Sequence, residues 1–251
     1  MRSARRSLTA VLLAVPMLVA AAPAGPAATE PQPLAGRTIA LDPGHQLGNG
    51  RHPRQINRPV WVGLWKACNT TGTATNGGFP EATFTWRVSR ALARRLEALG
   101  ATVRMTRSTN SVADWGPCVD ARGRFGARVG ADLAVSLHGD GAAASTHGFF
   151  VIRPGRRAGW TDDIVGRSRA LALRVRAGLL GAGFPVSTAY GGDGLDVRRD
   201  LGTLNAADVP TVMVELGNMR NARDARCMTS SSCRSRYARG LADGVVAHLA
   251  G

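Results

Sequence analysis

Short apolar runs alternate with amphipathic stretches along most of the chain. The apolar runs have the length of strands buried in a sheet, and we expect strands at residues 38–41, 102–105, 133–137, 149–152 and 211–214. The amphipathic stretches between and after them predict helices at residues 81–99, 119–129, 164–180 and 237–249. Alternating strands and helices predict an α/β fold, a single domain with a largely parallel sheet flanked by helices.

The first 24 residues have the pattern of a secretory signal peptide. Arginines precede an apolar stretch at residues 8–20, and small side chains follow where a signal peptidase would cleave. A membrane anchor is the alternative, but the apolar stretch is short for a bilayer. We therefore expect a secreted protein of the periplasm or cell wall, with a signal peptide at 1–24, an Ala/Pro-rich lead-in at 25–36 and the folded domain at 37–251.

Four cysteines in an exported chain predict two disulfides. Three pairings are possible. Cys227 and Cys233 are close in sequence and would close a small loop, which leaves Cys68 and Cys118 to close a long one. A zinc site made of cysteines is the alternative, but the spacing matches no such motif.

Three buried strands lead into residues that can bind a metal or transfer a proton. His45, His138 and Glu215 each follow one of these strands within a few positions. Because the carboxyl ends of parallel strands meet at one edge of a sheet, we expect these three side chains to share a cleft. Glu81 opens the first long helix, where the helix dipole favours a carboxylate, and it can project into the same cleft.

Two histidines and one carboxylate are the protein ligands of many catalytic zinc sites, which leave a position open to water. Zinc lowers the pKa of bound water to about 7, and a carboxylate that is not a ligand can then move the proton. The structural alternative is that both histidines are ordinary hydrogen-bonded residues and that the glutamate of the helix only complements its dipole. The common motifs of other hydrolases, such as HExxH and GxSxG, are absent from the sequence.

Four separated segments of the chain resemble the zinc-dependent N-acetylmuramoyl-L-alanine amidases known as the amidase-3 family. They are IALDPGH at 39–45, PE at 80–81, VSLHGDG at 135–141 and PTVMVELGNMRN at 210–221. The resemblance covers essentially residues 37–250 and is closest to the small secreted amidases of the mycobacterial type. It implies a six-stranded mixed sheet and hydrolysis of the amide that joins N-acetylmuramic acid to L-alanine in peptidoglycan or muropeptides.

The same resemblance implies a role for each of the four residues at the strand and helix ends. His45, Glu81 and His138 match the ligands of one zinc ion per chain, and Glu215 matches the catalytic glutamate. The chain departs from the family's common pattern at Asp140, where an asparagine is frequent. A carboxylate accepts hydrogen bonds but does not donate them, so a contact made there would differ.

Further residues are candidates for supporting roles beside this site. Asp42 is expected to orient His45, as histidine ligands usually require, although a turn-forming aspartate is an equal alternative. Asn218 and Asp140 are placed to line the cleft. Three arginines near the motifs can bind stem-peptide carboxylates, although solvated surface arginines are the alternative: Arg198, Arg199 and Arg220. The insertion at 46–80 is expected to form a flap over the cleft.

The formal net charge of +15 bears on the partners of the protein. Arginine supplies nearly all of the positive charge, because Lys66 is the only lysine. An arginine-rich surface attracts anionic wall polymers at a distance. Nucleic acid would be attracted too, but the signal peptide and disulfides argue against such a partner, and we expect none. We expect a monomer without stable membrane insertion.

Two other functions agree with the same residues. One is a zinc peptidase or carboxypeptidase that acts on wall peptides, and the other is a wall-binding protein with a degenerate site. The nature of the products separates the first alternative from an amidase. Loss of hydrolysis on chelation, with recovery on adding zinc, excludes the second.

Overall fold

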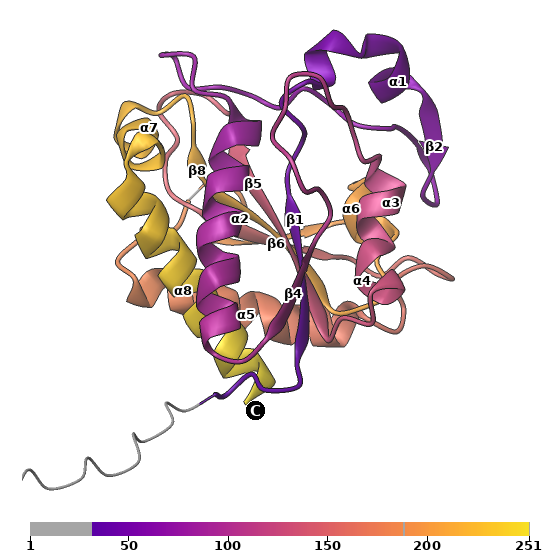
Figure 1. Ribbon diagram of the computed structural model, residues 1–251, viewed down its shortest axis with the longest axis vertical. Coiled ribbons are helices and arrows are strands. Elements are labelled where there is room, and N and C mark those ends of the chain that lie inside the picture. Colours follow the sequence, from indigo (N-terminus) through magenta and orange to yellow (C-terminus); the bar gives the residue numbers. More distant parts are fainter. Residues whose placement is uncertain (1–31, 188, 251) are drawn as a thin grey trace, which may run out of the picture. The chain divides into compact units, whose positions relative to one another are not determined.

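The computed structural model describes residues 32–187 and 189–250. The predicted signal peptide and most of the predicted lead-in lie outside the described residues. Six strands form one mixed sheet, as predicted, and their order in it is β4-β1-β5-β8-β6-β7 (Figure 1). Their bounds are β1 (Thr38–Pro43), β4 (Thr102–Met105), β5 (Leu133–Asp140), β6 (Phe150–Pro154), β7 (Leu195–Arg198) and β8 (Thr211–Asn218).

Four neighbouring strands of this sheet, β4, β1, β5 and β8, are parallel. Strand β6 is antiparallel to β8 and parallel to β7, so this edge of the sheet runs in the opposite direction. The three strands that carry the predicted site, β1, β5 and β8, are therefore adjacent and end at the same edge, as the sequence predicts.

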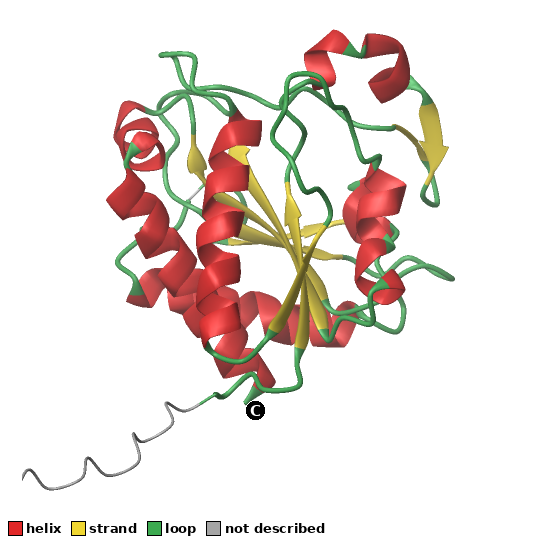
Figure 2. Ribbon diagram, in the orientation of Figure 1, coloured by secondary structure: helices red, strands yellow, loops and turns green. Residues whose placement is uncertain are grey.

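Helices cover both faces of the sheet (Figure 2). On one face pack α2 (Glu81–Ala98), α5 (Val165–Gly181) and α8 (Ser231–Leu249). On the other face pack α3 (Val119–Gly123), α4 (Phe125–Arg128) and α6 (Gly202–Asn205). The remaining helices are α1 (Pro53–Asn57), α7 (Ala222–Thr229) and a 3₁₀ turn, η1 (Asn49–Arg51). None of the helices in the described part of the chain is both long and apolar enough to cross a membrane.

The alternation of side chains along the central strands decides what each face of the sheet carries. Leu133, Val135 and Leu137 of β5 belong to the large core against α2, α5 and α8. Ala134 and Ser136 between them point to the opposite face, and His138 continues this series. The site residues of the strands thus lie on the face covered by α3 and α6, away from the large core.

Several elements differ from those that the apolar pattern predicts. The loop expected after β1 contains a short hairpin, β2 (Pro59–Trp61) and β3 (Trp65–Ala67). Strand β7 was not predicted, since two of its four residues are charged. The helix expected at 119–129 is two short helices, α3 and α4. A Cβ atom at Gly123 would lie 2.5 Å from the carbonyl oxygen of Thr203, so a glycine is needed for α3 to pack against α6.

Both predicted disulfides are present. Cys68–Cys118 ties the end of the hairpin to the start of α3, and Val60 and Val119 pack around it. Cys227–Cys233 joins α7 to α8. The described residues hold no free cysteine.

Candidate active site

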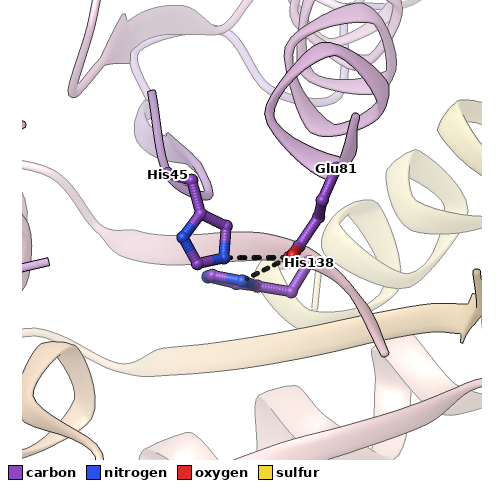
Figure 3. Close-up of side chains that lie close together, drawn as sticks. All are labelled: His45, Glu81 and His138. Atoms are coloured by element: carbon purple, nitrogen blue, oxygen red, sulfur yellow. Dashed lines mark hydrogen bonds and ion pairs between the residues drawn. The ribbon is translucent and has the colours of Figure 1, made fainter. Parts of the chain in front are cut away.

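Three side chains predicted as metal ligands meet at the carboxyl edge of the sheet. One nitrogen of His45, one nitrogen of His138 and one oxygen of Glu81 all lie within 4.8 Å of one another. Glu81 Oε1 is 3.1 Å from His45 Nε2 and 3.0 Å from His138 Nδ1 (Figure 3). The two imidazole rings are nearly perpendicular, with centroids 5.0 Å apart. The three donor atoms therefore face a common point.

Backbone amides hold the carboxylate of Glu81 in place. This residue is the first of α2, and its Oε2 accepts a hydrogen bond from the Thr73 amide at 2.9 Å. Its Oε1 accepts one from the Gly139 amide at 3.1 Å. The loop before α2 and the end of β5 thus both fix the carboxylate, and the start of the helix favours its negative charge.

His45 has a left-handed backbone conformation, with φ of 58°, which is uncommon for a residue with a side chain. Arg122 Nη2 donates to the carbonyl oxygen of His45 at 2.7 Å, and Thr85 Oγ1 donates to that of Gly44 at 2.9 Å. A Cβ atom at position 44 would lie 2.5 Å from the His138 ring. The glycine before His45 therefore lets the two ligands approach each other, and buried side chains hold the unusual turn.

The surroundings of His45 define which of its ring nitrogens carries a proton. Nδ1 lies 3.1 Å from the carbonyl oxygen of Thr70 and 3.2 Å from the hydroxyl of the same residue. A carbonyl oxygen can only accept a hydrogen bond, so Nδ1 carries the proton in the neutral ring. The lone pair of Nε2 then faces the point shared with Glu81 and His138. This is the arrangement in which a histidine binds a metal.

The charges of the group favour a cation between the ligands. Burial raises the pKa of Glu81, but His45 and His138 outweigh it, and the pKa lies well below its usual range. Burial lowers the pKa of His45, but the carboxylate of Glu81 outweighs it, and the net shift is upward. Both pKa shifts mean that a positive charge beside the carboxylate of Glu81 is favourable. Two imidazole nitrogens and one carboxylate oxygen could thus hold a metal ion.

Glu215 lies beside this group without joining it. It stands opposite His138 in the pairing of β8 with β5, so both side chains are on the same face of the sheet. Its Oε2 is buried and has no hydrogen-bond partner among the described residues. Burial, and then the carboxylates of Glu81 and Asp140, raise the pKa of Glu215 well above its ordinary value. This carboxyl group is therefore suited to taking up a proton.

A cavity of about 510 Å³ is lined by His45, Glu81, His138 and Glu215 together. One wall comes from the hairpin and the loop after it, with Lys66, Ala67 and Thr70 among its residues. Residues of α6 and the residue before it, Leu201, also line the cavity. The 46–80 insertion, expected as a flap, thus supplies a wall of the cavity.

Asp42 does not contact His45, so the direct orienting role expected from the sequence is wrong. Its oxygens accept hydrogen bonds from Arg122 at 2.5 Å, Ser136 at 2.6 Å and Thr106 at 2.6 Å. Burial raises the pKa of Asp42, but Arg122 and the two hydroxyls outweigh it and lower the pKa to about 2. Asp42 instead holds Arg122, which in turn holds the backbone of His45.

The other supporting candidates have different positions. Asp140 lines the cavity, as expected. Asn218 is buried outside the lining, and its Nδ2 donates to Ala143 O at 2.8 Å and to Thr146 Oγ1 at 2.9 Å. It therefore fixes the loop after β5 and does not line the cleft, which corrects the expectation from the sequence.

None of the three arginines expected to bind substrate lines the cavity. Arg198 Nε and Nη2 each donate to a carboxylate oxygen of Asp200 at 2.7 Å. Arg199 and Arg220 are exposed. The cations that do line the cavity are Arg122 and Lys66, and sequence reasoning missed both. In the sequence, Lys66 stood out only as the single lysine of an arginine-rich chain.

Comparisons with known proteins agree with the fold and with the extent of the domain. The sequence profile of the N-acetylmuramoyl-L-alanine amidases matches residues 39–247. An N-acetylmuramoyl-L-alanine amidase of Mycobacterium tuberculosis is 38% identical over 226 residues, which cover 89% of this chain and 91% of that protein.

Two crystal structures of mycobacterial amidases are similar to this one. The apo form of Ami1 from Mycobacterium abscessus is 40% identical, with a TM-score of 0.80 over 86% of this chain and 100% of that chain. Ami1 from Mycobacterium smegmatis is 35% identical, with a TM-score of 0.80 over 86% of this chain and 98% of that chain. Since the family profile runs from β1 to α8, and the relatives match over nearly their whole length, the chain belongs to the N-acetylmuramoyl-L-alanine amidase family.

Proposed function

We propose that this enzyme is a zinc hydrolase that cuts the amide bond between N-acetylmuramic acid and the L-alanine of the stem peptide. The observation that carries the proposal is the meeting of His45, Glu81 and His138 in one cavity with the unpartnered carboxyl group of Glu215. The family membership of the chain supports the same reaction.

The donor set fits zinc. Two imidazole nitrogens and one carboxylate oxygen are a common ligand set for this ion, which leaves a fourth position open. The backbone contacts of Glu81 and the Thr70 carbonyl at His45 Nδ1 hold two ligands in their binding orientation. Zinc bound there would supply Lewis-acid chemistry, which polarises an amide carbonyl and makes water easier to deprotonate.

Glu215 moves the proton in this proposal. In its ionised form, Oε2 accepts a proton from the attacking water, because no other described group occupies that oxygen. The raised pKa favours keeping that proton until the carboxyl group passes it to the leaving alanine nitrogen. The amide bond then breaks, and the products are a muramic acid carboxylate and a stem peptide with a free N-terminal alanine.

The proposal includes export of the protein. The apolar pattern of residues 1–24 supports a signal peptide, and disulfides are typical of oxidising compartments outside the cytoplasm. The substrate would then be the peptidoglycan of the cell wall or fragments released from it.

Glu215→Gln and His138→Ala together test the roles in the site. Glu215→Gln preserves the shape of the carboxyl group but cannot accept the proton, so we expect kcat to fall by at least about a hundredfold while zinc remains bound. His138→Ala removes a ligand, so we expect the bound zinc itself to be lost. Zinc per chain is measured by metal analysis, and cleavage of a defined muropeptide by mass spectrometry.

The products decide between the proposed reaction and its alternatives. An amidase releases the stem peptide with its N-terminal alanine intact. A peptidase or carboxypeptidase releases shorter peptides or single amino acids, and a wall-binding protein releases nothing. Substantial activity of Glu215→Gln would refute the assigned proton transfer. Unchanged zinc content of His138→Ala would refute the assigned ligand set.

A further inference from the structure

The cavity has one positive side chain that no described residue engages. Lys66 lies in β3 of the hairpin and lines the cavity. In the pairing of β2 with β3 it stands opposite Val60, which is buried. Trp61 and Trp65 pair on the other face of the hairpin and are 50% and 67% exposed. The alternation of the strands therefore directs Lys66 inward, toward the cavity.

The second cation of the cavity, Arg122, is already fully engaged. It forms a buried ion pair with Asp42 and donates to the carbonyl oxygens of Pro43 and His45. The ammonium group of Lys66, in contrast, forms no hydrogen bond or ion pair within residues 32–187 and 189–250. Asp200, an acid on the α6 side, is occupied, since both of its oxygens accept from Arg198 at 2.7 Å. The hydrogen bonds and charge of Arg198 lower the pKa of Asp200 against the effect of burial, and Lys66 adds a smaller lowering.

The carboxyl groups of Glu81, Asp140 and Glu215 line the same cavity as the two cations Arg122 and Lys66. Because Arg122 is paired with Asp42, it offers no free charge to a carboxylate of the substrate. A carboxylate of the substrate can form an ion pair with Lys66 on the hairpin, whose ammonium group has no partner among the described residues. A lysine on a flexible stem can follow a carboxylate as a point charge without a fixed bidentate geometry.

We propose that Lys66 is a specificity residue that binds a free carboxylate of the stem peptide during amide hydrolysis. The inference rests on the proposed function, which places the scissile bond at the metal ligands and the stem peptide along the cavity. The second residue of a stem peptide is a D-glutamate linked through its side chain, so its α-carboxyl group is free as an acid or is an amide. The enzyme therefore prefers stem peptides with the acid at this position.

Two substrates that differ only in this group test the inference. They are N-acetylmuramoyl-L-alanyl-D-isoglutamate, with the carboxylate, and N-acetylmuramoyl-L-alanyl-D-isoglutamine, with the amide. In both, the γ-carboxyl group is blocked as a methylamide, so that no second carboxylate is present. For Lys66→Met we expect KM for the acid to rise about tenfold, with KM for the amide within about twofold of wild type and kcat little changed. Lys66→Arg keeps the charge and should retain most of the preference for the acid.

Arg54→Met is the matched control, because it removes one positive charge from exposed α1 outside the cavity. We expect this variant to treat both substrates as wild type does. An equal effect of Lys66→Met on both substrates, or no effect on either, would overturn the inference while leaving the amidase reaction intact. If wild type released no intact dipeptide from either substrate, the proposed function itself would fail.

Discussion

At the scale of single residues, Arg122 connects the proposed metal ligands to the interior of the protein. Its guanidinium is buried, pairs with Asp42 and donates to the carbonyl of His45, whose backbone is left-handed. A buried cation without its partner is costly, so the position of His45 depends on the charge of Asp42. The site therefore extends one residue beyond the groups that face the cavity.

Asp42→Asn is expected to weaken the protein in a way that depends on pH. Because the folded-state pKa of about 2 is below the unfolded value, the carboxylate stabilises the fold above about pH 4. This contribution, about 2 to 3 kcal/mol, is lost as pH falls from about 4 to 2. The unfolding free energies of wild type and variant, measured with denaturant at each pH, should therefore converge toward pH 2.

Asp162→Asn is the control for this experiment. It breaks the exposed ion pair between Arg156 and Asp162, where N and O are 2.9 Å apart. An exposed pair contributes less than about 1 kcal/mol, so this variant should remain close to wild type across the range. A gap between Asp42→Asn and wild type that stays constant with pH would contradict the ionised state of Asp42.

At the scale of elements, glycines let α5 and α8 approach each other on the face of the large core. A Cβ atom at Gly244 of α8 would lie 2.6 Å from the Cα atom of Val175 and 2.7 Å from the carbonyl oxygen of Arg174. Both contacts are to the backbone of α5, which cannot rotate away as a side chain can. The glycine thus sets the distance between α8 and α5, the helix that packs against β6 and β8.

Gly244→Ala is expected to destabilise the protein by about 1 to 3 kcal/mol, because the added methyl group overpacks the helix contact. Gly166→Ala is the matched control, since Gly166 lies on α5 and a methyl group added there would meet no atom within 4 Å. The control should be neutral or stabilised by up to about 1 kcal/mol. Thermal unfolding measures both, and equal melting temperatures for the two variants would refute the packing argument.

At the scale of the whole molecule, positive charge dominates. The formal net charge is +15, or +12 without Arg2, Arg5 and Arg6 of the proposed signal peptide, and peptidoglycan and its associated polymers are anionic. Charges of opposite sign raise the rate at which an enzyme meets a polymer, and salt screens this attraction beyond about 8 Å at physiological ionic strength. Long-range attraction of this kind can bring the catalytic domain to the wall.

Salt should therefore slow hydrolysis of intact wall more than hydrolysis of a small neutral muropeptide. Between about 50 mM and 500 mM NaCl we expect the rate on insoluble wall to fall about tenfold and the rate on the small substrate to change less than about twofold. Release of stem peptide measures both rates. An equal response of the two substrates would show that net charge does not contribute to wall binding.

Much of the site was predictable because it follows from local pattern and one topological rule. Buried strands that run into His45, His138 and Glu215 have to bring them to one edge if the strands are parallel and adjacent. The start of a helix at Glu81 could be located from the amphipathic pattern that follows it. The hairpin and β7 were not predictable in the same way, because short, partly exposed strands have no continuous apolar run.

The sequence by itself determined the alternation of the main strands and helices and the presence of two disulfides, since each depends on residue type and spacing along the chain. It also indicated which histidines and glutamates would meet, and the resemblance to a known family predicted their roles. Only the tertiary structure decided that Asp42 supports Arg122 and not His45, that Asn218 holds a loop, and that Lys66 and Arg122, and not the three expected arginines, line the cavity. These roles depend on which side chains from distant segments come within hydrogen-bond distance. Local pattern carries no information on such contacts, because packing of the whole domain sets them.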